Sequence, residues 1–199
     1  MSDRTEELRV IRDAIVHLSE SPLYEYRTRN NYFPVIGQGS HYARIMFIGE
    51  APGKNEAETG RPFVGAAGRL LDEMIASIGI NREDVYITNI VKDRPPENRD
   101  PRPEEIELYA PFLVRQIEII QPQVIATLGR FSMEFILRLF NMPEASQKIS
   151  MLHGKLLNAR AEYGPIHIVP LFHPAAALYK ASDRELHFQD FQVLRQFTE

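Results

Sequence analysis

The stretch that decides the fold is ARIMFIGEAPG, residues 43–53. Residues 43–48 form a short, almost continuous apolar run, which is typical of a strand buried on both faces of a sheet. Gly49 ends this run, and the next four residues form a turn that contains Pro52 and Gly53. The stretch therefore predicts a buried strand whose carboxyl end carries a tight turn, where the backbone can approach a planar ligand closely.

Further strands and helices extend this pattern along the chain. Strands are predicted at 85–90, 124–129 and 166–172, and helices at 5–19, 65–78, 103–117, 130–140 and 183–197. Pro111 predicts an early kink or a restart in the third of these helices. Strands that alternate with helices indicate a parallel sheet covered on both faces, with ligands at the carboxyl ends of the strands. The length fits one domain over residues 1–199.

The composition is that of a globular protein, with 44% hydrophobic and 25% charged residues. The 23 basic and 27 acidic side chains give a net charge of −4, so a basic surface would have to be local. No apolar run approaches the roughly 18 residues of a membrane span, and the polar, acidic N-terminus is not typical of a signal peptide. The absence of cysteine excludes disulfides and thiolate metal sites, and it fits a cytoplasmic protein.

Side chains that can carry chemistry follow three of the predicted strands. Glu50 lies in the first turn, Asn89 ends the second strand, and His173 follows the fourth. Phe63 lies in the Gly/Pro-rich loop 60–65, where a ring can stack on a flat ligand. Each residue alone also has a structural interpretation, as a solvated carboxylate, an internally bonded amide, a structural imidazole or a core ring. The histidines show no metal-ligand spacing.

Five motifs occur in order along the chain: Gly49–Gly53, Gly60–Gly65, Tyr86–Lys92, Arg94–Pro96 and His173–Ala175. Over about residues 18–180 this combination resembles the family 4 uracil-DNA glycosylases. The resemblance implies a three-layer αβα sandwich with a central four-stranded parallel sheet. It also implies a monofunctional enzyme that flips uracil out of DNA and hydrolyses its N-glycosidic bond. The expected partner is uracil-containing DNA, with no membrane partner, and the expected state is a monomer.

The resemblance also implies a role for each motif residue. Glu50 and His173 are expected to be catalytic, the carboxylate acting on water or the sugar cation and the imidazole on the uracil oxyanion. Phe63 is expected to stack on the flipped uracil, and Asn89 to read its edge. The other residues expected to bind uracil are Gly49, Ala51, Gly53 and Glu56.

Two segments are candidates for DNA contacts. Lys92 and Arg94 belong to a basic segment interleaved with prolines, which can equally be a solvated loop. In the loop after His173, Leu178 or Tyr179 can wedge into a duplex, and Lys180 can meet a phosphate.

The sequence departs from the family at its metal site. Family 4 members bind a four-iron cluster through four cysteines, whereas this chain has Leu18, Ser21, Asp93 and Tyr109 at those positions. We therefore expect no metal and no cofactor, with packing and hydrogen bonds joining the N-terminal segment to residues 93–109. A related branch traps uracil covalently through a histidine in an inserted loop. Residues 92–100 contain neither feature, which argues against covalent trapping.

Two alternative functions stay open. The chain can be a non-catalytic module that binds damaged DNA, or a glycosylase for another deaminated base such as hypoxanthine or xanthine. Retention of Glu50 and His173 favours an enzyme, because a pure binder needs neither the carboxylate nor the oxyanion donor. Asn89 favours uracil without excluding another base.

Overall fold

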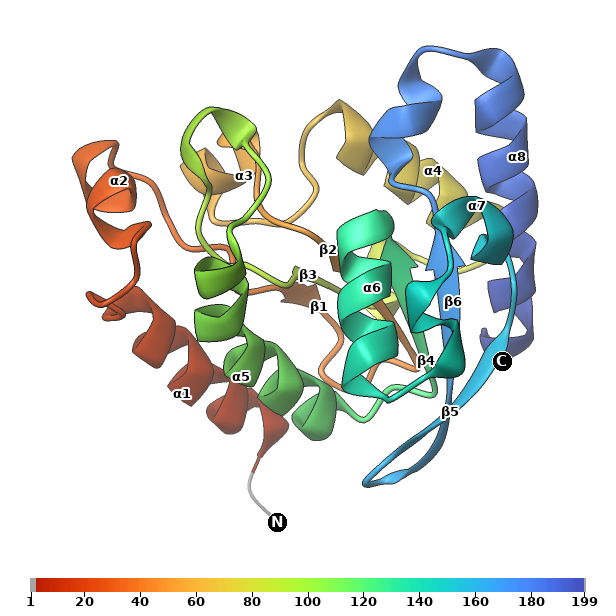
Figure 1. Cartoon of the computed structure of the whole chain (residues 1–199), viewed down its shortest axis with the longest axis horizontal. Helices are drawn as coiled ribbons and strands as arrows, with labels where there is room; N and C mark the ends of the chain where they lie inside the picture. The colour runs from red at the N-terminus through yellow and green to blue at the C-terminus, as the bar shows by residue number, and fades with distance from the viewer. Residues whose placement is uncertain (1–2, 199) are drawn as a thin grey trace.

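The computed structural model describes residues 3–198, which form a mixed six-stranded sheet with helices on both faces (Figure 1). The strand order is β1-β3-β2-β4-β6-β5. The four predicted strands are its parallel centre: β2 (Ile45–Gly49), β3 (Tyr86–Asn89), β4 (Val124–Leu128) and β6 (Gly164–Leu171). The predicted parallel arrangement is therefore confirmed.

The sheet extends beyond the expected four parallel strands, because an antiparallel strand pairs with each edge of the parallel centre. β1 (Gln38–Gly39) pairs with β3, and β5 (Leu157–Ala161) pairs with β6. β1 is only two residues long, and β5 alternates half-buried and exposed residues instead of forming an apolar run. Neither segment carries the buried-strand pattern of the four central strands.

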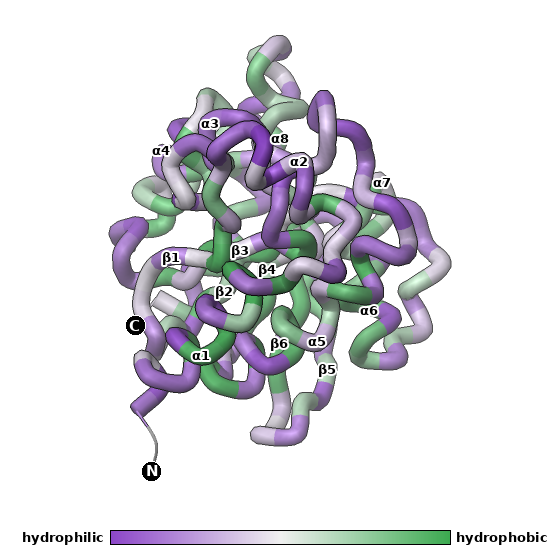
Figure 2. The backbone as a smooth tube through the Cα atoms, turned by 90° about the vertical axis from the view of Figure 1, so that its left-hand side faces the viewer, coloured by the Kyte–Doolittle hydropathy of each residue, from purple (hydrophilic) through white to green (hydrophobic). Residues whose placement is uncertain are grey.

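Alternation along the strands separates two cores. Met46 and Ile48 of β2 face one core, whereas Ile45 and Phe47 face the other. The first core is covered by α1 (Arg4–Val16), α5 (Pro103–Ile120) and α6 (Arg130–Leu139), and the second by α4 (Ala66–Ser77) and α8 (Ala181–Phe191). Figure 2 shows the hydrophobic central strands enclosed by more hydrophilic outer segments. The result is the predicted three-layer αβα sandwich.

Short elements complete the chain. The short α-helices are α2 (Tyr24–Arg29), α3 (Lys54–Thr59) and α7 (Ile149–Leu152), and the 3-10 helices are η1 (Arg82–Asp84), η2 (Pro96–Asn98), η3 (Pro143–Ser146), η4 (Pro174–Leu178) and η5 (Gln192–Phe197). α5 continues through Pro111, so no restart occurs there. The last predicted helix is instead α8 followed by η5. Within residues 3–198, no helix is long and apolar enough to cross a membrane.

Candidate active site

A cavity of about 460 Å³ lies at the carboxyl ends of β2, β3 and β6. The predicted site residues that line it are Glu50, Ala51, Gly53, Glu56, Phe63, Asn89 and His173. They come from segments spread over more than 120 residues of sequence, and the parallel strands bring them to one edge of the sheet. The structure therefore brings most of the predicted pocket together.

Gly49 is not among the residues that line this cavity, but it lies against Asn89 and Phe63, which are. A Cβ atom built on Gly49 would lie 2.8 Å from Cζ of Phe63 and would also collide with Oδ1 of Asn89. Only glycine lets the amide and the ring approach the end of β2 this closely. The residue expected to bind uracil thus acts by leaving room for its neighbours.

Asn89 ends β3 with its side chain buried, at 2% exposure. Its Oδ1 atom is buried and has no hydrogen-bond partner among the described residues. A buried acceptor without a donor is costly, so a ligand that brings an N–H group would satisfy it. The amide also offers N–H donors, so it can pair with a ligand edge that has a donor beside an acceptor.

Phe63 and His173 form adjacent parts of the wall. Their ring centroids are 5.7 Å apart with an angle of 31° between the planes. Phe63 has a backbone φ of 50°, in the left-handed region that residues other than glycine seldom adopt. The ring is therefore placed by an unusual backbone conformation and not by the period of a helix or strand.

The structure indicates which nitrogen of His173 can donate. The backbone N–H of Ala175 donates to Nδ1 of His173 at 3.1 Å, so a neutral ring carries its proton on Nε2. Burial lowers the pKa of His173, His187 lowers it further, and Glu56 opposes the shift. The imidazole is therefore held neutral, with an N–H group available for a ligand.

Glu50 is half-buried in the turn after β2. Burial raises the pKa of its carboxyl to about 7, Asp100 raises it further, and Arg130 opposes the shift. The carbonyl of Glu50 accepts a hydrogen bond from the N–H of Val91 at 3.0 Å, which fixes its backbone. A carboxyl with such a pKa exchanges protons near neutral pH, as acid–base groups in active sites do.

Glu56 connects two walls of the cavity. Its Oε1 atom accepts hydrogen bonds from the N–H groups of Val64 and Gly65, at 2.8 and 3.0 Å. The carboxylate therefore holds the loop that carries Phe63 while it also lines the cavity.

The prediction that Lys92 contacts DNA is wrong, because the side chain is fully buried. Its Nζ atom donates to Oγ1 of Thr88 (2.7 Å), the carbonyl of Asn89 (2.7 Å) and Oε1 of Gln116 (2.6 Å). Thr88 donates its own proton to Ile36, so all three partners of Lys92 are acceptors. Three acceptors match the three N–H groups of an ammonium, although burial lowers the pKa of Lys92.

The other candidates for DNA contacts are accessible to different degrees. Arg94 is half-buried and donates to the hydroxyl of Tyr32 at 2.8 Å. Leu178, Tyr179 and Lys180 are exposed, and Tyr179 reaches 89% exposure. This exposed segment begins three residues after Ala175, which lines the cavity.

The cavity wall also includes residues that are not among those expected to be catalytic or to bind uracil: Pro52, Gly65, Ala66, Ala67, Pro95, Asn98, Arg99 and Ala175. Asn98 and Arg99 line the cavity beside Pro95. Arg99 forms a forked ion pair with buried Glu105, with Nη1–Oε2 and Nη2–Oε1 distances of 2.9 and 2.5 Å. Glu105 lies in the first turn of α5, where a glutamate is typical of a helix cap, so its position along the chain does not indicate this pairing.

The four positions that carry cysteine in family 4 do not fit an iron–sulfur cluster here. Three of them form a buried network in which Tyr109 donates to Oδ2 of Asp93 (2.6 Å) and its hydroxyl lies 2.9 Å from Oγ of Ser21. Arg27 donates to both carboxylate oxygens of Asp93, at 3.2 and 3.3 Å. Leu18 is buried in the adjacent core. Cluster iron needs thiolate or imidazole ligands, and this set has neither.

This network confirms that hydrogen bonds join the N-terminal segment to residues 93–109. Burial raises the pKa of Asp93, while Tyr109 and Arg27 oppose the shift. Arg27 also donates to the carbonyl groups of Ile15 and Val16, at the end of α1. Among residues 3–198, no group of three or more His, Asp or Glu side chains is placed to hold a metal ion.

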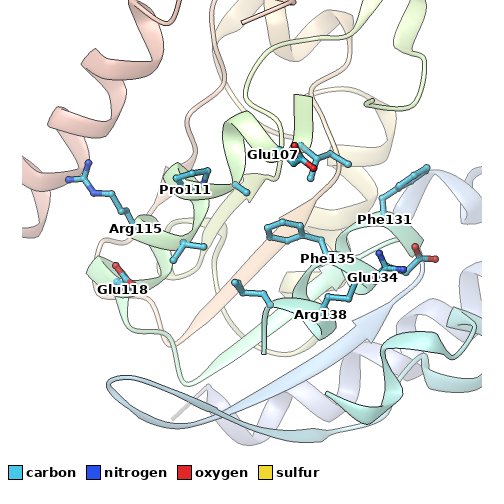
Figure 3. Close-up of a pocket in the computed structure, with 12 residues that line it drawn as sticks. Glu107, Pro111, Arg115, Glu118, Phe131, Glu134, Phe135 and Arg138 are labelled. Atoms are coloured by element: carbon cyan, nitrogen blue, oxygen red, sulfur yellow. The ribbon is translucent and has the colours of Figure 1, made fainter. Parts of the chain in front are cut away.

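A larger hollow of about 810 Å³ lies between α5 and α6, away from these residues (Figure 3). Its lining is mostly apolar and includes Pro111 and Phe135, while charged residues such as Glu107 and Arg138 also line it. None of the predicted site residues lines this hollow. The cavity at the strand ends is therefore the better candidate for chemistry.

Comparisons with known proteins identify sequences that are similar to this chain over most of its length. A family model described as "Uracil DNA glycosylase superfamily" matches residues 36–194. The chain is 49% identical over 169 residues to a type-4 uracil-DNA glycosylase of Archaeoglobus fulgidus, which covers 85% of this chain and 83% of that protein. It is 43% identical to a type-4 uracil-DNA glycosylase of Sulfurisphaera tokodaii, over 96% of this chain and 84% of that protein. It is 38% identical to one of Thermotoga maritima, over 99% of this chain and 97% of that protein.

Proposed function

The chain belongs to the uracil-DNA glycosylase superfamily, and from this membership we propose that it removes uracil from DNA. The reaction is hydrolysis of the N-glycosidic bond, which leaves an abasic site. The observation that carries the proposal is the orphaned, buried Oδ1 atom of Asn89, in a cavity that Phe63 and His173 also line. Uracil is flat and presents an N–H group between two carbonyl oxygens, so it suits this set of groups.

Recognition begins with extrusion of the base from the helical stack, which costs a few kcal/mol. Stacking on Phe63 offsets part of this cost. Oδ1 of Asn89 accepts from N3–H of uracil, and Nδ2 donates to O4. Cytosine presents the opposite pattern at these two positions, so one amide distinguishes the two bases.

Cleavage creates negative charge on the uracil and positive charge on the sugar. Nε2–H of His173 donates to the uracil oxygen that gains charge, and a single preorganised donor of this kind contributes roughly 3–4 kcal/mol. Glu50, as a carboxylate, stabilises the sugar cation or orients the attacking water. Both residues act mainly in the transition state, so both raise the rate more than the affinity.

The exposed segment Leu178–Lys180, at the end of η4, is the proposed contact with the duplex. Leu178 or Tyr179 fills the space that the extruded base leaves, and Lys180 meets a phosphate. Arg94 is the remaining candidate for a backbone contact on the other side of the cavity. We further propose that the protein acts as a monomer, because one chain supplies every group of the pocket. The proposed compartment is the cytoplasm, which the absence of cysteine fits.

The test is single-turnover excision from oligonucleotides that contain one uracil, hypoxanthine or xanthine, followed by alkaline cleavage of the abasic site. Uracil excision is the expected result. Binding without cleavage would support a damage-binding module instead, and faster excision of a purine would move the substrate to another deaminated base. Asn89→Asp should lose most uracil excision, because its carboxyl group lacks the N–H donor for O4 of uracil. It should gain activity on cytosine, because the amino group of cytosine can donate to the carboxyl oxygen at that position. Unchanged uracil excision by a folded Asn89→Asp variant would remove this residue from recognition.

A further inference from the structure

The backbone around Phe63 is held in a conformation that it would not adopt alone. Its φ of 50° lies in the left-handed region, although the residue has a bulky side chain. Such residues persist only where the surrounding structure determines their conformation, and they concentrate at functional sites. The question is therefore which groups hold this backbone in place.

Arg82, in η1, holds the two carbonyl groups next to this strained position. Its Nη2 donates to the carbonyl of Pro62 in a short hydrogen bond, and its Nη1 donates to the carbonyl of Phe63 at 3.2 Å. The guanidinium is itself fixed by Asp72 of α4, at 2.6 Å from Nη1. The Arg82 side chain is only 20% exposed, so these hydrogen bonds are partly shielded from water.

Two further contacts close the other sides of this loop. A Cβ atom on Gly68 would overlap the carbonyl group of Phe63, so α4 lies directly against the loop backbone. Glu56 accepts hydrogen bonds from the N–H groups of Val64 and Gly65. The carbonyl groups of residues 62 and 63 are therefore held by Arg82, and the N–H groups of residues 64 and 65 are held by Glu56.

We propose that Arg82 is a positioning residue that clamps the Phe63 backbone and so preorganises the ring for stacking on the extruded base. Arg82 is absent from the residues that line the cavity, so it acts through Phe63 and not on the base. Without it, the strained turn can relax, and only a fraction of molecules keeps the ring in the wall. The rate of excision falls to that fraction of the wild-type rate, while binding of the duplex through its phosphates is unchanged.

The first experiment measures how firmly Arg82 holds the loop, and it does not depend on enzyme activity. Hydrogen exchange of the Val64 and Gly65 amides is compared in wild type, Arg82→Met and Arg184→Met. Arg184 is the matched control, because it pairs with Glu73, next to Asp72 on α4, and has no hydrogen bond to residues 62–65 among the described contacts. Exchange should accelerate about tenfold or more in Arg82→Met only, since local opening is then easier. Equal exchange in all three proteins would overturn the proposal.

A fluorescent reporter gives a second reading of the ring itself. The sequence contains no tryptophan, so Phe63→Trp introduces a single one into the wall. Adding Arg82→Met to this variant should increase acrylamide quenching and lower the anisotropy, whereas adding Arg184→Met should change neither. A reporter that stays equally rigid and protected in both combinations would contradict the clamp.

The second experiment connects the clamp to the proposed function, on which this inference rests. Arg82→Met should lower the single-turnover rate on uracil by about tenfold or more, with DNA affinity within about twofold of wild type. Arg82→Lys should recover part of the rate, because an ammonium still donates to a carbonyl. A wild-type rate in Arg82→Met would refute the positioning role. If the wild-type protein excised no uracil, the proposed function would fail, while the exchange data would still decide whether the clamp exists.

Discussion

The ionisation of Glu50 should control how the rate of excision depends on pH. Burial in the cavity wall raises the pKa of this carboxyl to about 7, with Asp100 adding to the shift and Arg130 opposing it. In the proposed mechanism the charged form stabilises the sugar cation or orients water, so the active form becomes scarce as the pH falls below 7. The rate should therefore rise with pH through this range.

The size of the effect follows from the pKa. One pH unit below it roughly one eleventh of the molecules carry the carboxylate, and one unit above roughly ten elevenths do, so the rate should rise about tenfold between them. Further down, the rate should fall about tenfold per pH unit. The pKa of His173 is lowered, so this imidazole becomes protonated only at lower pH. Its protonation adds a second, steeper limb to the plot of rate against pH. Both groups act when deprotonated, and the two limbs have the same sign.

The assay is single-turnover excision at enzyme concentrations below saturation, because kcat/KM then reports the free enzyme. Glu50→Gln should be slow and should lose the upper limb, leaving the limb of His173. Asp100→Asn should move the upper limb to lower pH, and Arg130→Gln should move it to higher pH, as their opposite effects on Glu50 require. An upper limb that persists in Glu50→Gln, or neighbours that shift it in the same direction, would refute this reasoning.

Three further perturbations test other parts of the structure. His173→Ala should slow single-turnover excision about 100-fold and leave DNA affinity nearly unchanged, because it removes one oxyanion donor; an unaltered rate would dismiss this role. Asp93→Ala should destabilise the protein by about 3–5 kcal/mol, since it leaves Arg27 buried without its carboxylate. Calorimetry should show a melting temperature lower by about 10 °C, and a decrease of less than about 2 °C would mean that the network contributes little to stability. Lys92→Met should cost about 3 kcal/mol or more in urea unfolding, because three buried acceptors lose their donor, and it should also slow excision by loosening Asn89. Full stability with normal excision would show that the buried ammonium has neither role.

The sequence predicts those parts of the molecule that depend on local patterns. Apolar runs predict the four central strands, and the residues that follow them predict most of the pocket, because parallel strands end at one edge. The edge strand β5 escapes prediction because it carries no buried run and is held by pairing with β6. The register of such a strand depends on its neighbour and not on its own residues.

The residue that the sequence misplaces, Lys92, and one that it does not single out, Arg82, both depend on contacts between distant segments. Lys92 lies near a proline-rich basic segment, which is typical of an exposed loop, yet Gln116 accepts its hydrogen bond from 24 residues away. Arg82 reaches carbonyl groups 19 and 20 residues before it in the chain. No spacing rule connects such pairs, because their proximity is a result of packing the sheet against its helices.

The buried network and the candidate pocket are separate in function but adjacent in the chain. Asp93 belongs to the network, and the preceding residue, Lys92, holds the backbone carbonyl of Asn89. Lys92 has three hydrogen-bond partners, and none of them belongs to the network of Asp93, Tyr109, Ser21 and Arg27. The backbone of Asn89, the residue proposed to recognise the base, is therefore held by a side chain that takes no part in the network. The residues at the four positions where the resemblance to family 4 implies cysteine therefore share no hydrogen-bond partner with the Lys92 side chain that holds Asn89.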